Sequence, residues 1–185
     1  MKKALLLHGT DGSSQSNWLP WLKVELEAQG WTVWVPDLPQ SDRPNIQRYN
    51  DFIFAHMPWE FDSDTYIVGH SSGAVEALGL LQAFTDDTVI AESILIGSFM
   101  DDLGWDSLSG LFEKPFEYDV IRARCRTFTF IHSDDDPYCP LPHAEYLSEK
   151  LNGELKVISG QKHFSTGTDP KYTTFPLLRD LLLSR

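Results

Sequence analysis

The sequence predicts a three-layer α/β fold, in which helices cover both faces of a doubly wound, mostly parallel sheet of about six strands, with no separate cap domain. Two observations predict it. Short apolar runs without a clean period of two alternate with stretches of helical periodicity from one end of the chain to the other. The 185 residues, 42% of them hydrophobic, also suffice to bury a substantial core. We therefore expect residues 1–185 to form a single domain.

Six apolar runs are the expected strands. They are Ala4–Leu7, Trp31–Val35, Thr65–Val68, Ser93–Ile96, Thr127–Ile131 and Leu155–Ile158. Strands covered on both faces are short and apolar, as these runs are. In a doubly wound sheet, ligands bind beyond the carboxyl ends of the strands, so the residues that follow each run are the candidates for chemistry.

The segments between the runs show helical spacing. The helices expected on this basis run from a cap at Asn17 to Gly30, along the stripe Ala74, Ala77, Leu78 and Leu81, from Pro142 to Leu151 with Gly153 beyond, and over Thr174–Leu183. Each of these helices follows one of the expected strands, the first of them after a glycine-containing loop. This order favours parallel strands joined by helical crossovers.

Charge and cysteine content restrict the partners and the compartment. The formal net charge is −12, and no basic cluster could bind nucleic acid or an anionic membrane. The apolar stretch after Lys3 ends at His8, which is too short for a signal peptide, and no later run is long enough to span a bilayer. Cys125 and Cys139 form neither a disulfide framework nor a CxxC metal site. We expect a cytoplasmic protein.

A candidate nucleophile follows the third expected strand. Gly69-His70-Ser71-Ser72-Gly73 is a G-x-S-x-G motif, and the second helical stripe begins directly after it. In this strand–turn–helix context the serine occupies a tight, strained turn, and the helix N-terminus offers N–H groups to a developing oxyanion. A glycine- and serine-rich turn without function would show the same letters, so the surrounding strand and helix carry the prediction.

A nucleophilic serine needs a base, and the base needs an acid that orients it. In this context the chain order is serine, then acid, then histidine, with both partners in loops after later strands. Asp134, Asp135 and Asp136 follow the fifth expected strand, and His163 follows the sixth. Three aspartates could also form a solvated turn, and a lone loop histidine usually has no catalytic role. Their joint placement favours an acid–base pair.

The remaining histidines fit the role of base less well. His56 precedes the serine, His70 lies inside the motif, and His132 and His143 flank the aspartates without a later strand between. His8 belongs to a loop after the first strand.

That first loop, His8-Gly9-Thr10-Asp11-Gly12, is expected to lie beside the serine turn. It could supply one backbone N–H to an oxyanion, from Thr10, while Ser72 supplies the other. A glycine turn without any ligand is the alternative for this loop.

The aspartate cluster also raises the question of a metal. Hard cations need oxygen ligands from several positions, and the EF-hand spacing is absent around Asp134–Asp136. We expect no metal site and no cofactor.

These motifs together resemble the α/β-hydrolase superfamily and, within it, the small retinoblastoma-binding-protein-type serine hydrolases. The resemblance covers nearly the whole chain. It is strongest in Ile67–Ala74, Ser109–Phe116, Asp135-Asp136-Pro137 and His163-Phe164. The superfamily's Asp-x-x-x-Pro acid loop matches Asp136 to Pro140, which makes Asp136 the implied acid and Asp135 the fallback. The L-x-C-x-E pocket-protein motif is absent, so no pocket-protein partner is implied.

The resemblance and the residues imply a serine hydrolase that cleaves a small carboxylic ester, or an amide, through an acyl-enzyme, with Ser71, Asp136 and His163 as the triad. Two alternatives use the same fold. One is a non-catalytic interaction protein, and the other is an acyltransferase that passes the acyl group to an acceptor other than water. The sequence leaves the natural substrate and the oligomeric state open.

The long connection after the fourth expected strand, residues 97–119, contains an unusually apolar set of side chains. They are Phe99, Met100, Leu103, Trp105, Leu108, Leu111, Phe112, Pro115 and Phe116. The segment is too short for a cap domain, yet loops of this length are commonly functional. We expect an apolar rim beside the serine, although about half of these residues could simply pack against the sheet.

Overall fold

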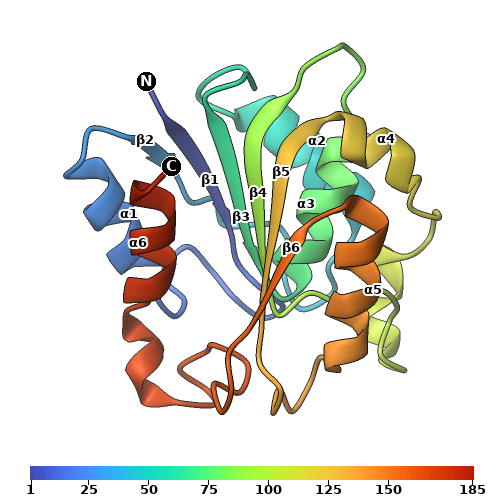
Figure 1. Cartoon of the computed structure of the whole chain (residues 1–185). Coiled ribbons are helices and arrows are strands. Elements are labelled where there is room, and N and C mark those ends of the chain that lie inside the picture. The colour runs from blue at the N-terminus through green and yellow to red at the C-terminus, as the bar shows by residue number, and fades with distance from the viewer.

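The computed structural model describes residues 1–185, and its centre is a six-stranded, all-parallel sheet (Figure 1). The strands are β1 (Lys3–Leu7), β2 (Thr32–Trp34), β3 (Thr65–His70), β4 (Ile90–Ile96), β5 (Cys125–His132) and β6 (Glu154–Val157). Their spatial order is β2-β1-β3-β4-β5-β6. From β1 the chain passes to β2 at one edge of the sheet, returns to β3 on the other side of β1, and then adds β4, β5 and β6 in order to the opposite edge. The predicted doubly wound fold is confirmed, with every expected strand present and shifted by at most a few residues.

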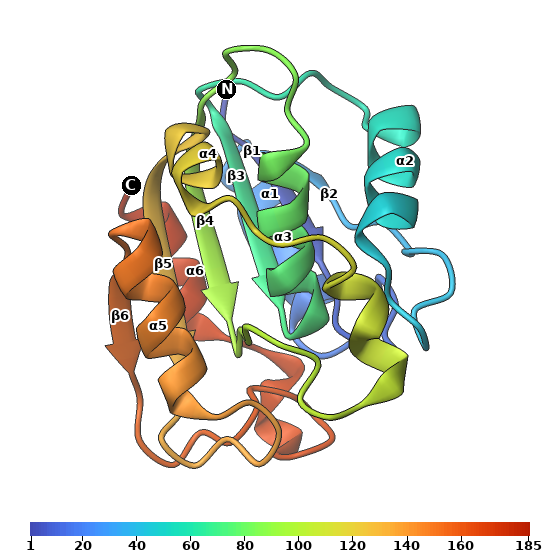
Figure 2. The same cartoon turned by 90° about the vertical axis from the view of Figure 1, so that its right-hand side faces the viewer.

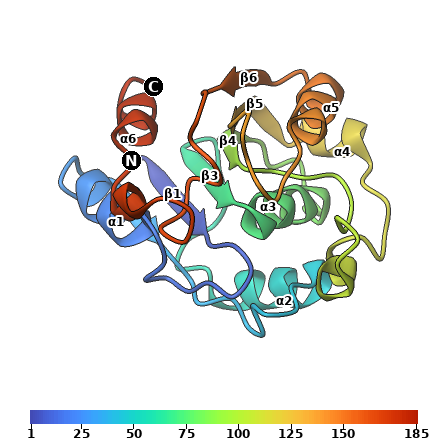
Figure 3. The same ribbon diagram turned by 90° about the horizontal axis from the view of Figure 1, so that it is seen from below.

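Helices cover both faces of the sheet. They are α1 (Leu19–Glu27), α2 (Ile46–His56), α3 (Ser72–Gln82), α4 (Tyr118–Ala123), α5 (Leu141–Leu151) and α6 (Pro176–Leu183). Helices α1 and α6 lie on one face and the other four on the opposite face (Figures 1 and 3). Each face has its own apolar core cluster of 20 or 18 buried residues, which accounts for the nearly continuous apolar character of the central strands.

Asn17 does not cap α1, contrary to the sequence-based expectation. The helix begins after Trp18 without any side-chain cap. Asn17 instead has a left-handed backbone, and its Oδ1 accepts hydrogen bonds from the N–H and the hydroxyl of Thr166, both at 2.9 Å. A long-range contact to the loop after β6 has therefore replaced the local capping bond.

Helix α2 was not expected from the sequence, although it carries a readable start signal. Asn45 is extended, and its Oδ1 accepts the N–H of Arg48 at 3.0 Å, which is the usual N-cap geometry. Only Tyr49, Asn50 and Ile53 of this helix are buried. Both the amphipathic pattern of this segment and its Asn45 cap are present in the sequence, so the helix could have been predicted from them.

The carboxyl ends of the strands meet at one end of the sheet, where long loops follow β1, β4, β5 and β6 (Figure 2). The predicted site residues belong to these loops and to the β3–α3 turn. No cap domain covers this end, because the connection from β4 to α4 consists of loops and one 3-10 helix, Asp106–Leu111. No helix of the chain is long and apolar enough to cross a bilayer. Both cysteines are free and buried.

Candidate active site

Ser71 occupies a strained turn between β3 and α3. Its φ of 57° and ψ of −123° lie where side-chain-bearing residues are disfavoured. Its N–H donates to the carbonyl oxygen of Ile96 on the neighbouring strand at 2.8 Å, which ties the turn to the end of β4. The half-buried serine therefore projects from a fixed backbone at the carboxyl end of the sheet.

The two glycines of the motif are required by close backbone contacts. A Cβ on Gly69 would lie 2.3 Å from the carbonyl oxygen of Gly73. A Cβ on Gly73 would lie 2.5 Å from the carbonyl oxygens of both Leu7 and His8. Helix α3 can pack this tightly against β1 and β3 only because both positions lack a side chain.

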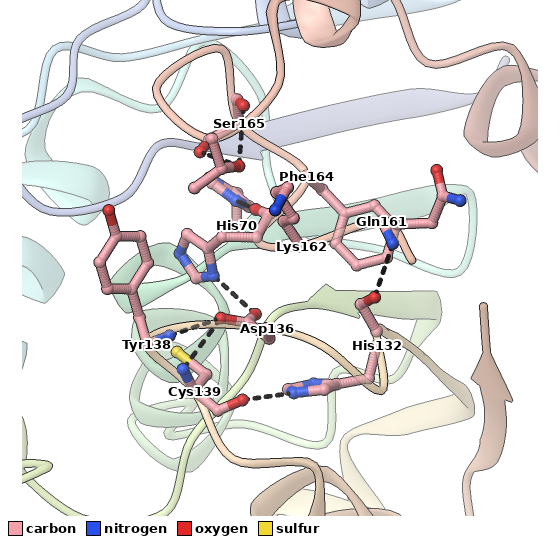
Figure 4. Close-up of polar contacts among 12 residues, drawn as sticks. His70, His132, Asp136, Tyr138, Cys139, Gln161, Lys162, Phe164 and Ser165 are labelled. Carbon is pink, nitrogen blue, oxygen red and sulfur yellow. Dashed lines mark hydrogen bonds and ion pairs between the residues drawn. The ribbon is translucent and has the colours of Figure 1, made fainter. Parts of the chain in front are cut away.

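Asp136 and His163 form a buried hydrogen-bonded pair. His163 Nδ1 lies 2.7 Å from Asp136 Oδ2. Asp136 Oδ1 accepts the backbone N–H groups of Tyr138 at 2.9 Å and Cys139 at 3.0 Å (Figure 4). Burial alone would raise the pKa of Asp136, but the bond from His163 and the two N–H donors outweigh it and hold the pKa below its ordinary value. The carboxylate is thus ionised and fixed, and Nε2 of His163 is left free.

The neighbouring aspartates accept hydrogen bonds from backbone N–H groups and not from the histidine ring. Asp135 Oδ1 accepts the N–H of Lys162 at 2.7 Å and the hydroxyl of Ser133 at 2.6 Å. Asp134 Oδ1 accepts the N–H of Gly160 at 2.9 Å. Both carboxylates therefore hold the backbone of the segment that carries His163, whereas Asp136 contacts the histidine ring itself.

Because the three aspartates make different contacts, substituting each of them tests which one orients the base. We expect Asp136→Asn to lower kcat by roughly 10⁴-fold, the loss seen for the equivalent change in a model triad. Asp135→Asn keeps an acceptor oxygen for Lys162 and is expected to cost about tenfold or less, and Asp134→Asn less still. Esterase kinetics on the three purified variants measure this. A larger loss at Asp135 than at Asp136 would show that the wrong neighbour was chosen.

Ser71 and His163 both line one cavity of about 390 Å³. Its lining comprises Gly9, Thr10, Asp11, Gly12, Ser16, Asn17, His70, Ser71, Phe99, Leu103, Trp105, Leu108, Tyr138, Cys139, His163, Ser165 and Gly167. No hydrogen bond joins the Ser71 hydroxyl to the histidine ring. Catalytic hydrogen bonds commonly tighten only when substrate is bound, so the shared cavity is the relevant observation.

Thr10 and Ser72 lie together beside the serine turn. The hydroxyl of Thr10 donates to Ser72 Oγ at 3.0 Å. Ser72 is the first residue of α3, so its N–H has no partner within the helix, and the N–H of Thr10 makes no hydrogen bond within the chain. A Cβ on Gly9 would lie 3.0 Å from the Cβ of Ser71, which shows how closely this loop approaches the serine. Two free N–H groups are therefore available near Ser71.

Two other histidines near the site have structural partners. Nε2 of His8 accepts the N–H of Leu38 at 3.0 Å. Nε2 of His132 lies 2.8 Å from the carbonyl oxygen of Cys139 and holds the acid loop in place (Figure 4). Burial lowers the pKa of both rings, so both are neutral near pH 7.

Asp136, Cys139 and His163 each place one potential ligand atom within 4.8 Å of the others. Their chemistry does not favour a metal. Both oxygens of Asp136 already accept hydrogen bonds. Burial raises the pKa of the Cys139 thiol well above its ordinary value, and only the thiolate is a good metal ligand. The group is better suited to orienting the imidazole.

The apolar connection after β4 contributes part of the expected rim. Phe99, Leu103, Trp105 and Leu108 line the cavity, and Trp105, 49% exposed, packs edge-on against Tyr138 at 6.2 Å between ring centroids. Phe112, which the rim was expected to include, does not line the cavity. Its ring packs against those of Phe99 and Phe116 instead. The expected rim is therefore narrower than the sequence suggested.

We expect Trp105→Ala to raise KM, or to shift chain-length preference, by roughly five- to thirtyfold, because about 1–2 kcal/mol of apolar contact is lost. The rate of covalent labelling at Ser71 by a small probe should change much less. Phe112→Ala is the matched control and should affect KM less. Equal effects of the two variants would remove Trp105 from the binding surface, and an activity jump above a substrate's micellar concentration would contradict an uncapped site.

The all-parallel sheet, the serine turn between β3 and α3 and the Asp–His pair beyond β5 and β6 define an α/β-hydrolase-type protein without a cap. The chain belongs to the serine hydrolase family, whose model matches residues 4–184. The resemblance noted from the sequence is thereby confirmed.

Individual relatives agree with this assignment. The chain is 25% identical to the YdeN protein of Bacillus subtilis over 184 residues, which are 99% of this chain and 95% of that protein. It is 26% identical to serine hydrolase RBBP9 of Rattus norvegicus over 168 residues, with 88% and 87% of the two chains covered. The crystal structure of YdeN superposes with a TM-score of 0.91 over 100% of this chain and 98% of that one.

More distant proteins share this fold. Est1E of Butyrivibrio proteoclasticus, one structure of which contains bound ferulic acid, is 16% identical and superposes with a TM-score of 0.73 over 100% of this chain and 89% of that one. An esterase of Exiguobacterium antarcticum is 14% identical, with a TM-score of 0.68 over 100% and 91% of the chains. At these identities the likeness concerns the fold alone.

Proposed function

We propose that residues 1–185 act as one α/β-hydrolase domain that cleaves a small carboxylic ester through an acyl-enzyme. One observation carries the proposal: Ser71, in its strained turn, shares a cavity with His163, whose Nδ1 is held by Asp136 at 2.7 Å. Membership of the serine hydrolase family and the esterase folds among the structural neighbours support it.

The proposed reaction uses the chain's own groups. Ser71 Oγ attacks the carbonyl carbon while Nε2 of His163 takes the hydroxyl proton, and the ionised Asp136 stabilises the imidazolium. The N–H groups of Thr10 and Ser72 hold the oxyanion, each contributing about 3 kcal/mol in comparable sites. The protonated His163 then gives its proton to the leaving alcohol. Water, activated by the same ring, releases the acid and restores Ser71.

The cavity suggests which part of a substrate lies where. Aromatic and aliphatic side chains from the β4 connection and the acid loop line one side, including Phe99, Trp105 and Tyr138. Ferulic acid, bound in a structure of Est1E, which has a similar fold, is an aromatic carboxylic acid. We therefore propose an apolar or aromatic acyl group as the preferred substrate portion. The same triad would serve amide cleavage or acyl transfer.

A fluorophosphonate probe and a series of p-nitrophenyl esters test the proposal. We expect stoichiometric labelling at Ser71 and turnover of short to medium esters without added metal or cofactor. Added alcohols or amines should leave the acid as the main product, and trapping of most of the acyl group by them would favour acyl transfer. Absence of both labelling and turnover in the folded protein would favour a non-catalytic interaction protein.

A further inference from the structure

His70, the residue before the candidate nucleophile, makes a hydrogen bond that the proposed mechanism leaves unused. Its side chain is 3% exposed, and Nε2 lies 2.8 Å from the backbone carbonyl oxygen of His163. Burial lowers the pKa of His70 to about 3, so the ring is neutral and carries a single N–H. A carbonyl oxygen can only accept, so that proton is on Nε2 and is donated to His163.

The next carbonyl along the chain is held in the same way. Nε1 of Trp18 donates to the carbonyl oxygen of Phe164 at 3.1 Å, and the Trp18 ring packs edge-on against His70 at 5.9 Å between centroids. We call the loop after β6 that carries His163 the base loop. Two of its consecutive carbonyl oxygens therefore accept hydrogen bonds from two buried rings, which also contact each other. One of those rings comes from the nucleophile turn itself.

The backbone on both sides of His163 needs such support. Lys162 and Phe164 have φ values of 52° and 53°, a left-handed conformation that non-glycine residues disfavour. The N–H of Lys162 is fixed by Asp135 at 2.7 Å, and the carbonyl of Phe164 by Trp18. His163 lies between these two strained residues, and its own carbonyl depends on His70.

We propose that His70 is a positioning residue, which fixes the backbone of His163 relative to Ser71 while Asp136 fixes the orientation of its ring. The inference rests on the proposed function. Because His70 and Ser71 are adjacent in one rigid turn, the hydrogen bond couples the position of the base directly to that of the nucleophile. The two imidazole rings also pack together, with centroids 4.8 Å apart. Misplacing a catalytic group by about 1 Å costs roughly 100-fold in rate.

Two substitutions separate the hydrogen bond from the bulk of the ring. His70→Phe keeps a planar ring without a donor, and His70→Gln keeps an amide N–H near the position of Nε2. We expect His70→Phe to lower kcat and the fluorophosphonate labelling rate together by roughly 10- to 100-fold, with KM within about threefold of wild type. His70→Gln should restore both rates to within about fivefold of wild type.

Leu22→Ala is the control for general loss of stability, because Leu22 lies in the same core cluster as Trp18 and Phe164 but makes no side-chain hydrogen bond to the base loop. It should lower the melting temperature while leaving kcat near the wild-type value. Wild-type rates in His70→Phe, equal losses in His70→Phe and His70→Gln, or a matching loss of kcat in Leu22→Ala would each overturn the positioning role. Failure of the wild type itself to label at Ser71 would instead refute the proposed function.

Discussion

Ser71→Ala is expected to abolish ester hydrolysis and covalent labelling, with a loss in kcat on the order of 10⁶-fold, comparable to removal of the nucleophile in a well-studied serine protease. The substitution removes the only atom that forms the acyl bond in the proposed mechanism. Any residual rate would come from binding and from the N–H groups near the serine turn. Active-site titration with a fluorophosphonate, followed by mass spectrometry of the labelled peptide, measures the result.

Folding should survive this change. Alanine retains the Cβ of serine, so the left-handed backbone at position 71 is no more strained than before, and the lost hydroxyl makes no hydrogen bond within the chain. An unchanged melting temperature is the control. Labelling of Ser71→Ala at the wild-type rate would remove the nucleophile assignment, and with it the whole proposed reaction.

His163→Ala is expected to reduce kcat by a similar factor, because loss of the base alone costs about as much as loss of the nucleophile when the two act as a unit. The loss should also appear in fluorophosphonate labelling, since that reaction needs the same activated serine. The double variant Ser71→Ala/His163→Ala should be no worse than either single variant. Additive losses in the double variant would show that the two residues do not act together.

His143→Ala supplies the matched control for this prediction. His143 lies near the start of α5, and its Nδ1 accepts the N–H of Met100 at 3.3 Å. The residue does not line the cavity. Its loss should lower kcat by less than about tenfold, as should His132→Gln, which removes a buried ring that supports the acid loop. If either variant were inactive while His163→Ala remained active, the assignment of the base to His163 would be wrong.

Much of the fold was predictable because strands buried on both faces leave a strong local signal. The run at Ala4–Leu7 is apolar throughout and the run at Thr65–Val68 is apolar after Thr65, and the structure extends each by only one or two residues. Helix α2 was not predicted although its N-cap at Asn45 is present in the sequence, and α4 was missed because it spans only six residues. The prediction that Asn17 caps a helix was wrong, because its Oδ1 accepts a hydrogen bond from Thr166, far along the chain, and not from the first turn of α1.

The candidate site likewise has features that the sequence predicts and features that only the tertiary structure sets. The sequence by itself determined the local features: a serine between two glycines at a strand–helix turn, aspartates after the fifth strand and a histidine after the sixth. Each is set by residue type and chain order. Only the tertiary structure decided that Asp136 meets the ring of His163 while Asp135 holds the backbone at Lys162, and that His70 donates to the carbonyl of His163. These choices depend on which side chains reach across loops 27 to 93 residues apart in the chain. Sequence patterns describe neighbours along the chain, whereas hydrogen-bond partners are set by the packing that folds distant loops together.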